Sequence, residues 1–413
     1  LLALLATAHA QSLDLPGLSA DATRYQHTIV QKYPAGVPDA LAHAAAGQAQ
    51  EAIGKGDWPA AVSAFTIGAA ANPENAGAWL ALARALMNLT PPDTTAALDA
   101  AWLSFQNADH AGAELPALAI VEQAAEALGQ KLTVIEVLEA MVSRAPKDRA
   151  LAARLNALSQ QYGLLVRRVH TNADVFPTRA CIAFTRPVGG SRDFQPGDWV
   201  MVSPRPADLA VTLESGQICL SGLPAGATTK VAFRPGMPGA DGTTLKTASV
   251  VPVALPDRSP RLAFNNERYL LPRDQAPAVV ISSVNLSAVT LRLVRISERN
   301  VLSFLGNNPP GSTIDFYAAR DIAQNAGAVV WHGKATIADY RKNALLHSVL
   351  KLPSRLFAGK PGLYALLAGP GDGTPFAGHS DQPAALQLIV RTDLAPTVWR
   401  GSDGLTVSVR GYA

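Results

Sequence analysis

Cysteine and histidine are the residue types in this sequence best suited to nucleophilic or metal chemistry. The two cysteines are Cys181 and Cys219, and the eight histidines are His9, His27, His43, His110, His170, His332, His347 and His379. No two histidines lie three or four residues apart, the spacing that brings two metal ligands to one face of a helix. Neither cysteine has histidine-rich surroundings that would indicate a nucleophile or a metal site. The sequence therefore supports neither metal nor thiol chemistry.

The glycine-rich run Gly369-Pro370-Gly371-Asp372-Gly373 follows an apolar strand pattern and faintly resembles a dinucleotide-binding loop. Thr374 stands where the third glycine should be, and Pro375 follows where a helix should start, so a hairpin loop explains the run better. Gly-x-Ser-x-Gly and Walker motifs are absent. The acidic residues are isolated, and we expect most of them to be solvated or to form turns. We accordingly predict that the chain is not an enzyme and holds no cofactor.

Both cysteines fall in short apolar runs that are typical of strands, Cys181–Thr185 and Gln217–Ser221. An even pair of cysteines within one domain most simply forms a disulfide in an oxidising compartment. The alternative is a pair of buried free thiols, because cysteine is also a common core residue. A Cys181–Cys219 disulfide is the one site that we predict.

The composition indicates a folded chain with no strong electric field. Its 413 residues are enough for roughly two to four domains. Lys and Arg number 35 against 32 Asp and Glu, a balance that gives nucleic acid or an anionic membrane little to bind. With 48% hydrophobic and 16% charged residues, the chain should fold rather than remain disordered.

The first residues resemble the end of a secretory signal peptide. Leu1–Ala10 is an apolar run that closes on small residues, and the alternative is a short buried helix. No later run approaches the length of a membrane span, and no cysteine follows the small residues to accept a lipid. We therefore expect a soluble protein that is exported through a Sec-type signal peptide and has no transmembrane segment.

Residues 38–163 show the spacing of paired amphipathic helices. Asp39–Gly54 and Pro59–Ala71 flank a Gly56-Asp57-Trp58 turn, a third helix is predicted over Asn75–Leu89, and a capping helix over Lys147–Tyr162. Ala61, Phe65 and Pro73 stand at the offsets of a tetratricopeptide repeat, and Trp79 and Leu82 begin the next one. The segment resembles three such repeats plus a cap. Its concave face could hold a peptide or an envelope protein, or the helices could be a plain spacer.

After Gly163 the pattern changes to short β-branched runs between Pro-Gly and Asp-Gly turns, which favours β-sandwiches. Val251–Pro260 separates two β units. The run Gly362–Ala368 is apolar on both faces and should be a central strand. Leu405–Arg410 alternates as a strand, and we expect it to be the lone first strand of a further domain. The other predicted strands are Trp199–Ser203, Val289–Ile296 and Ala385–Arg391.

The β units resemble the N-terminal macroglobulin-like domains of bacterial alpha-2-macroglobulins from about Leu165 to Ala413. The segments that carry the resemblance are Arg179–Cys181, Gln217–Gly226, Arg234–Gly242, Asp257–Pro260, Arg268–Arg273, Val294–Asn300 and Gly404–Val407. This resemblance implies a periplasmic inhibitor in which a protease cuts a bait segment and is trapped, in many members also by a Cys-x-Glu-Gln thioester. Cys181 precedes Ile-Ala-Phe and Cys219 precedes Leu-Ser-Gly, so neither is a thioester cysteine.

The expected fold class is multidomain, an all-α tetratricopeptide-like repeat followed by all-β sandwich domains of macroglobulin or immunoglobulin type. The expected plan is a signal-peptide remnant (1–10), a linker (11–37), the repeats (38–163), a β-sandwich (164–254), a macroglobulin-like β-sandwich (255–395) and the first strand of a truncated domain (396–413). The expected function is the N-terminal part of a protease inhibitor whose targets are proteases. The alternative is an envelope scaffolding module without protease inhibition.

Overall fold

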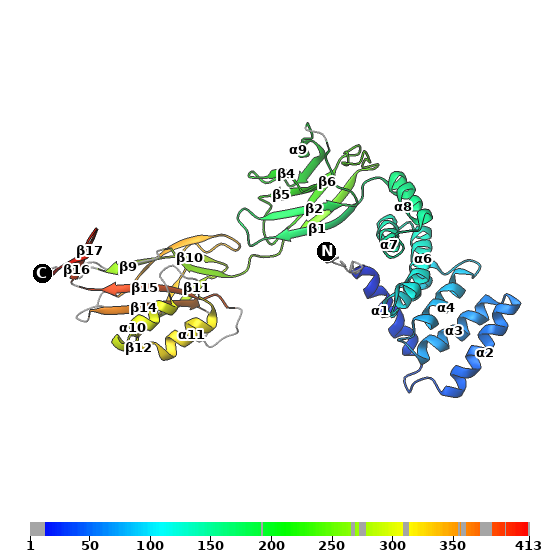
Figure 1. Ribbon diagram of the computed structural model, residues 1–413, viewed down its shortest axis with the longest axis horizontal. Helices are drawn as coiled ribbons and strands as arrows, with labels where there is room; N and C mark the ends of the chain where they lie inside the picture. Colours follow the sequence, from blue (N-terminus) through cyan, green and yellow to red (C-terminus); the bar gives the residue numbers. More distant parts are fainter. Residues whose placement is uncertain are drawn as a thin grey trace. The chain divides into compact units, whose positions relative to one another are not determined.

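The computed structural model describes residues 13–190, 193–265, 269–271, 278–308, 314–353, 356, 361–371, 382–392 and 394–411. The predicted signal-peptide remnant lies outside them. The chain divides into two compact units: unit 1 (Leu1–His170, Ala180–Leu220, Lys230–Pro252) and unit 2 (Thr171–Arg179, Ser221–Thr229, Val253–Ala413). Helices come first along the chain and mainly antiparallel sheets follow, which confirms the predicted fold class (Figure 1).

Helices make up the first part of unit 1. They are α1 (Pro16–Val30), α2 (Asp39–Lys55), α3 (Trp58–Ala71), α4 (Ala76–Met87), α5 (Thr94–Gln106), α6 (Ala111–Ala127), α7 (Lys131–Arg144) and α8 (Arg149–Tyr162). Side-chain caps begin α3, α4, α5 and α8, where Asp57, Asn75, Asp93 and Asp148 each accept a hydrogen bond from a backbone N–H of the first turn. Gly56, at a φ of 69°, ends α2 in the left-handed conformation.

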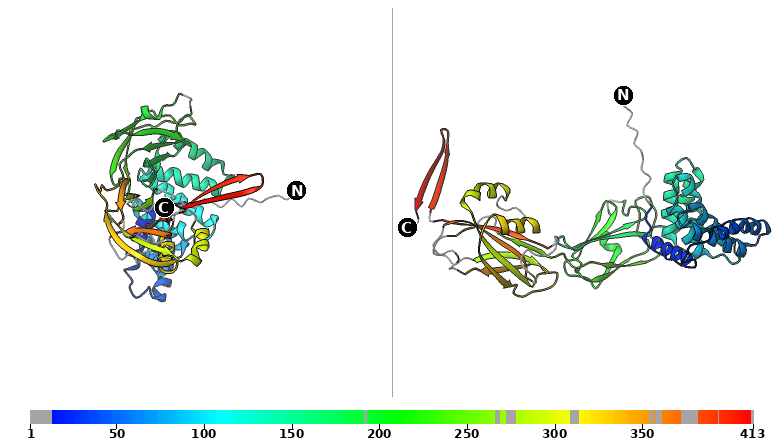
Figure 2. Two further views of the ribbon diagram at one scale, coloured as in Figure 1. Left: turned by 90° about the vertical axis from the view of Figure 1, so that its left-hand side faces the viewer. Right: turned by 90° about the horizontal axis from the view of Figure 1, so that it is seen from below.

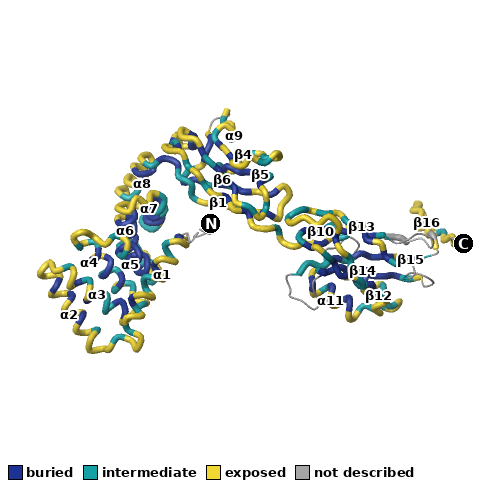
Figure 3. The backbone as a smooth tube through the Cα atoms, turned by 180° about the vertical axis from the view of Figure 1, so that it is seen from behind, coloured by how far each residue is buried: buried dark blue, intermediate teal, exposed yellow. Residues whose placement is uncertain are grey.

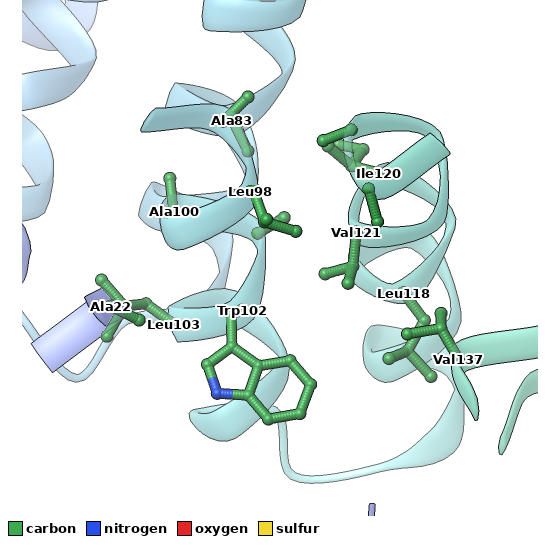
Figure 4. Close-up of a cluster of buried hydrophobic side chains, with 14 of the residues drawn as sticks. Ala22, Ala83, Leu98, Ala100, Trp102, Leu103, Leu118, Ile120, Val121 and Val137 are labelled. Carbon is green, nitrogen blue, oxygen red and sulfur yellow. The ribbon is translucent and has the colours of Figure 1, made fainter. Parts of the chain in front are cut away.

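The predicted arrangement of three helix pairs and a cap is present. Neighbouring helices α2 with α3, α4 with α5 and α6 with α7 are in contact, and α8 follows against α7. Figure 4 shows the core between the second and third pairs, where Leu98 of α5 points toward Val121 of α6. Trp79 and Trp102 are the largest fully buried side chains of this core. Stacking is needed because a single helix pair cannot bury its own apolar face.

The predicted linker over 11–37 is wrong for most of its length, because it contains α1. Leu15, Ala22 and Ile29 are buried, and α1 contacts α3 and α5. Pro16 begins the helix at a position where its missing N–H has no cost. The three- and four-residue apolar spacing of α1 was the signal for this helix.

Seven strands form two sheets in the first β region. One sheet has the order β1-β2-β5-β4 and the other β3-β6-β7, and α9 (Pro196–Trp199) is one short turn before β3. The strands are β1 (Val166–Asn172), β2 (Arg179–Phe184), β3 (Val200–Ser203), β4 (Ala210–Glu214), β5 (Gln217–Ser221), β6 (Thr228–Phe233) and β7 (Ser249–Ala254). Phe184 and Phe233 meet edge to face at 5.0 Å between ring centroids.

Unit 2 contains a sheet of order β12-β11-β14-β15-β9 and a second of order β13-β10-β8. Their strands are β8 (Arg261–Phe264), β9 (Tyr269–Leu271), β10 (Ala278–Val284), β11 (Ala288–Ile296), β12 (Gly327–Thr336), β13 (Leu346–Lys351), β14 (Gly362–Pro370) and β15 (Ala385–Arg391). β14 is central and buried along nearly its whole length, as predicted (Figure 3). One of its faces packs toward the smaller sheet.

The other face of β14 is covered by helices that the sequence analysis did not predict. They are η1 (Glu298–Asn300), α10 (Val301–Asn307) and α11 (Phe316–Asn325). Phe304 and Phe316 enter one buried cluster with Leu363 and Leu367 of β14. Both faces of β14 are therefore buried, one by a sheet and one by helices, and this explains its apolar sequence.

The expectation of a lone final strand is wrong. β17 (Gly404–Gly411) pairs antiparallel with β16 (Leu394–Gly401), and Figure 2 shows the two as a hairpin. The turn between them is Ser402-Asp403, and Gly404, the first residue of β17, has a φ of 125°. Pro396 on β16 hid this strand from pattern analysis, because proline is rare inside strands. The expected domain boundary at 396 therefore falls inside β16.

Candidate binding site in unit 1

The two predicted site residues are joined to each other. Cys181 lies on β2 and Cys219 on the neighbouring strand β5, and the structure has a disulfide between them. Cys219 is buried and Cys181 half-buried. Among the described residues no group of three or more Cys, His, Asp or Glu side chains could hold a metal ion. The cysteines therefore support the fold of the sheet and form no reactive site.

Two further motif candidates fall on strands of unit 2. β14 runs antiparallel to β15, so the glycine-rich run that starts at Gly369 begins a hairpin connection, and its residues 372 and 373 lie outside the described residues. Ser348 and Lys351 have the Ser-x-x-Lys spacing of some acyl-transfer enzymes, and our interpretation that the sequence contains no such motif is wrong. Both are on β13, where residues three apart point to opposite faces of the sheet. They cannot act on one substrate atom.

The site with binding character is a cavity of about 1000 Å³ in unit 1, which we call the α1–α5 cavity. Its walls come from α1, α5, the turn before α7, α7 itself and β1. The acidic side chains in the wall are Asp14, Asp21, Asp99 and Glu136, and the basic ones are Arg24, Arg167 and Arg168. Formal charge on the lining is thus slightly negative.

Asp99 is the unusual member of this lining. It lies in the middle of α5 and is only 8% exposed. Burial, together with the nearby charge of Asp21, raises the pKa of the Asp99 carboxyl to about 6, while Arg24 opposes the shift. Among the described residues none donates a hydrogen bond to Asp99 or forms an ion pair with it. A buried carboxylate without a partner is costly, and such groups gather at functional sites.

Helix α1 forms the wall opposite Asp99 and is firmly attached. The indole N–H of Trp102 on α5 donates a hydrogen bond to the hydroxyl of Ser19 at 3.0 Å. Tyr25 of α1 lines the cavity, and its ring centroid is 6.4 Å from that of Trp79. Burial and the negative charges of Asp93 and Asp99 raise the pKa of the Tyr25 phenol well above its ordinary value. Tyr25 therefore stays neutral and offers an aromatic ring and a hydroxyl to the cavity.

The far wall is neutralised by its own ion pairs. Arg167 of β1 lies 3.3 Å from Glu136 of α7 and also pairs with Glu139. Burial raises the pKa of Glu136, and Arg167 counteracts the rise. Arg24 pairs with Asp21 one turn away on α1. Two of the three arginines are thus already paired with carboxylates, so they have little remaining attraction for an anion.

The first helices of the three pairs form a second surface, and the sequence left open whether the repeats dock a peptide or are a plain spacer. In this arrangement the first helices of the pairs are α2, α4 and α6, and none of them lines the α1–α5 cavity. Arg84 is the single arginine on these three helices, and Lys55 the single lysine. This surface lacks the cluster of basic side chains that would recognise an acidic peptide tail.

Comparisons with known proteins give structural neighbours only. No family model and no curated protein matches the chain. A crystal structure of native alpha-2-macroglobulin from Escherichia coli, spanning domains MG0-NIE-MG1, is 14% identical, with a TM-score of 0.34 over 62% of this chain and 80% of that one. Salmonella alpha-2-macroglobulin reacted with methylamine is 16% identical, with a TM-score of 0.44 over 61% of this chain. This chain covers 15% of the Salmonella chain.

The helical part has neighbours of another kind. The TPR2AB domain of yeast Sti1, in complex with pHSP90, is 23% identical, with a TM-score of 0.25 over 34% of this chain and 48% of that one. The neighbours are thus bacterial alpha-2-macroglobulins and tetratricopeptide-repeat domains, and these identities and TM-scores are too low to assign a family. No described helix combines the length and the apolar character that crossing a membrane requires.

Proposed function

We propose that this chain is the N-terminal, non-catalytic scaffold of a periplasmic alpha-2-macroglobulin-like protease inhibitor. The observation that carries the proposal is the position of the segments that resemble this family. Most of their described residues lie on strands and in turns of consecutive β units, where sequence and backbone are closely linked.

The run Gln217–Gly226 illustrates this placement. Its first five residues are β5, and Gly222 and Gly226 have φ values of 88° and 73°, which favour glycine. The amide of Gly226 donates hydrogen bonds to the carbonyls of Leu255 and Pro256. A Cβ on Gly226 would lie 2.3 Å from the Asp257 carboxylate, which would have to move, and the positive φ would strain any other residue there.

The run Asp257–Pro260 is held within unit 2 by a polar cluster. The Asp174 carboxylate accepts hydrogen bonds from the amide and the hydroxyl of Ser259, both at 2.7 Å, and these bonds lower the pKa of Asp174. Asn343, at a φ of 62°, donates a hydrogen bond to Asp257 at 2.9 Å and accepts one from the amide of Arg258 at 2.9 Å. We call Asp174, Asp257, Ser259, Asn285 and Asn343 the Asn343 cluster.

The proposed role is supportive and includes no chemistry in this part of the protein. A thioester needs a free cysteine, and both cysteines of the chain are used in the disulfide. A disulfide also fits an oxidising compartment such as the periplasm. Bait and thioester, if the protein has them, belong to other parts of the full-length protein.

Capture of an active protease tests this function. Full-length protein is incubated with an equimolar protease and, separately, with the same protease blocked covalently at its active site, and both mixtures are separated by size-exclusion chromatography. We expect the active enzyme to elute with the inhibitor and the blocked enzyme to elute alone, because only cleavage closes a trap. Equal behaviour of the two enzymes contradicts the proposal.

A second function, a docking module that holds another envelope protein, is favoured by the α1–α5 cavity. Asp99 is buried in this cavity without a partner, and a bound ligand would stabilise its charge. The two functions use different parts of the chain, and a trap protein could also dock.

A further inference from the structure

We propose that the α1–α5 cavity binds a lysine or arginine side chain of a peptide segment from a partner protein, with Asp99 as the ion-pair partner of the cation. This site does not depend on protease inhibition. It follows from four features of unit 1, which are the buried carboxylate, the charges around it, the aromatic ring beside it and the hydroxyls that surround it.

The Asp99 carboxylate determines which charge the ligand must carry. Asp99 is 8% exposed, lines the cavity and has no hydrogen-bonding or ion-pairing partner among the described residues. The charges of Asp21 and Asp93 repel that of Asp99, and the charge of Arg24 attracts it. An added cation would offset both the lost hydration of Asp99 and the repulsion from its acidic neighbours. An added anion would increase that repulsion.

The arginines of the lining do not reverse this preference. Arg24 is paired with Asp21, and Arg167 with Glu136 and Glu139. The remaining arginine, Arg168 on β1, is exposed to solvent. An exposed cation attracts anions weakly, because water and salt screen it. Asp99 is thus the one buried charge of the lining for which the described residues supply no counter-ion.

The remaining lining suits the stem and backbone of a peptide. Tyr25 supplies an aromatic ring, which attracts ammonium and guanidinium groups. Leu98 and Leu132 can contact an aliphatic stem, while Thr95 and Thr133 can exchange hydrogen bonds with peptide groups. A cavity of about 1000 Å³ has room for several residues, more than a single amine fills.

Binding should depend on pH in a defined direction. The pKa of Asp99 is about 6, so the carboxyl is charged at neutral pH and neutral at pH 5. The charged and titratable groups that face it are Asp21, Arg24 and Tyr25 of α1, Asp93 at the start of α5, Glu136 of α7 and Arg167 and Arg168 of β1. Protonation of Asp99 removes the attraction for a cation, and we expect affinity to fall about tenfold from pH 7 to pH 5.

Isothermal titration calorimetry of the full-length protein tests the site. The probe is the peptide acetyl-Lys-Lys-Lys-amide, and the comparison ligands are the matching Gln and Glu peptides and spermidine. We expect binding of the lysine peptide at one site, loss of about thirtyfold or more in affinity in Asp99→Asn, and no pH dependence in that variant. The control Asp109→Asn removes the same charge from a side chain that is 88% exposed, and its affinity should equal that of the wild type.

Several results would overturn the proposal. These are no binding of the lysine peptide, equal binding of the Glu or Gln peptide, or unchanged affinity in Asp99→Asn. Binding of spermidine without binding of the lysine peptide would also overturn it, because the ligand would then be a free polyamine. Asp99→Asn keeps the shape of the side chain, and a thermal unfolding scan of both variants separates lost binding from lost folding.

Discussion

The Asp99 residue is more than nine-tenths buried and its carboxyl has a pKa of about 6. Because this pKa is above that of an exposed aspartate, the ionisation of Asp99 is linked to folding. The pKa is higher in the folded than in the unfolded chain, so the folded state holds the extra proton between about pH 4 and pH 6. Stability from this group is present below that window and is lost as the pH rises through it. At neutral pH the buried charge costs on the order of 1–3 kcal/mol.

We therefore predict that Asp99→Asn stabilises unit 1 at pH 7 and changes little at pH 4. The amide fills the same space without a charge, so the cost of burying the charge disappears. Urea unfolding curves at several pH values, followed by helical circular dichroism, measure the difference. A variant less stable than the wild type at pH 7 would mean that Asp99 has a stabilising partner in the folded protein.

Nothing in the residue pattern around Asp99 indicated that this side chain would be buried. An aspartate among alanines and leucines is compatible with a solvated helix face, and we expected the acidic residues to be solvated. Its burial results from α1, which packs against α5 from more than sixty residues away in the sequence. The disulfide could be predicted from the sequence, because that prediction needs only two strands and an even number of cysteines.

The Cys181–Cys219 disulfide should also stabilise the protein. The bond closes a loop with a sequence separation of 38, and it should contribute about 3–4 kcal/mol to stability through the unfolded chain. Reductant should lower the urea midpoint of the wild type and leave the double variant Cys181→Ser, Cys219→Ser unaffected. A thiol titration of the denatured, unreduced protein should find no free cysteine. Two titratable thiols would contradict the pairing.

At the scale of elements, Asn343 connects three segments of unit 2. Its side chain donates to the carbonyl of Ala225 at 3.1 Å and accepts from Asn285 at 2.9 Å, in addition to its bonds with Asp257 and Arg258. Its φ of 62° also favours asparagine or glycine over other residues.

We predict that Asn343→Ala destabilises unit 2 by about 2–4 kcal/mol, since it removes several partly buried hydrogen bonds and strains the backbone. Asn343→Gly loses the same bonds without the strain and should be about 1 kcal/mol more stable than the alanine variant. Chemical unfolding followed by a tryptophan signal compares the two. Equal stabilities would show that the backbone at residue 343 is unstrained.

Elements with clear start and stop residues were predictable. α2 ends before Gly56, α3 begins after Asp57 with Pro59 in its first turn, and α8 begins after Asp148. The predicted ranges of these three helices agree with the structure to within two residues. Elements were missed where the deciding partner is distant in the sequence or the signal is mixed. α11 has the spacing of an amphipathic helix, but it lies within a region of strands, and the face of β14 that it covers comes more than thirty residues later.

In the proposed function this chain is a scaffold and a docking module, and any bait segment or thioester belongs to other parts of the full-length protein. On this account the 413-residue chain alone should not inhibit any protease, and it is the matched control for the full-length protein.

The residual activity of several unrelated proteases, measured after incubation with the full-length protein, tests whether this protein traps proteases. Each is assayed on a large protein substrate and on a short peptide substrate. We expect loss of activity on the large substrate with survival on the peptide, because a trapped protease keeps its active site but excludes large molecules. Equal retention of both activities would contradict the account and leave docking through unit 1 as the function to pursue.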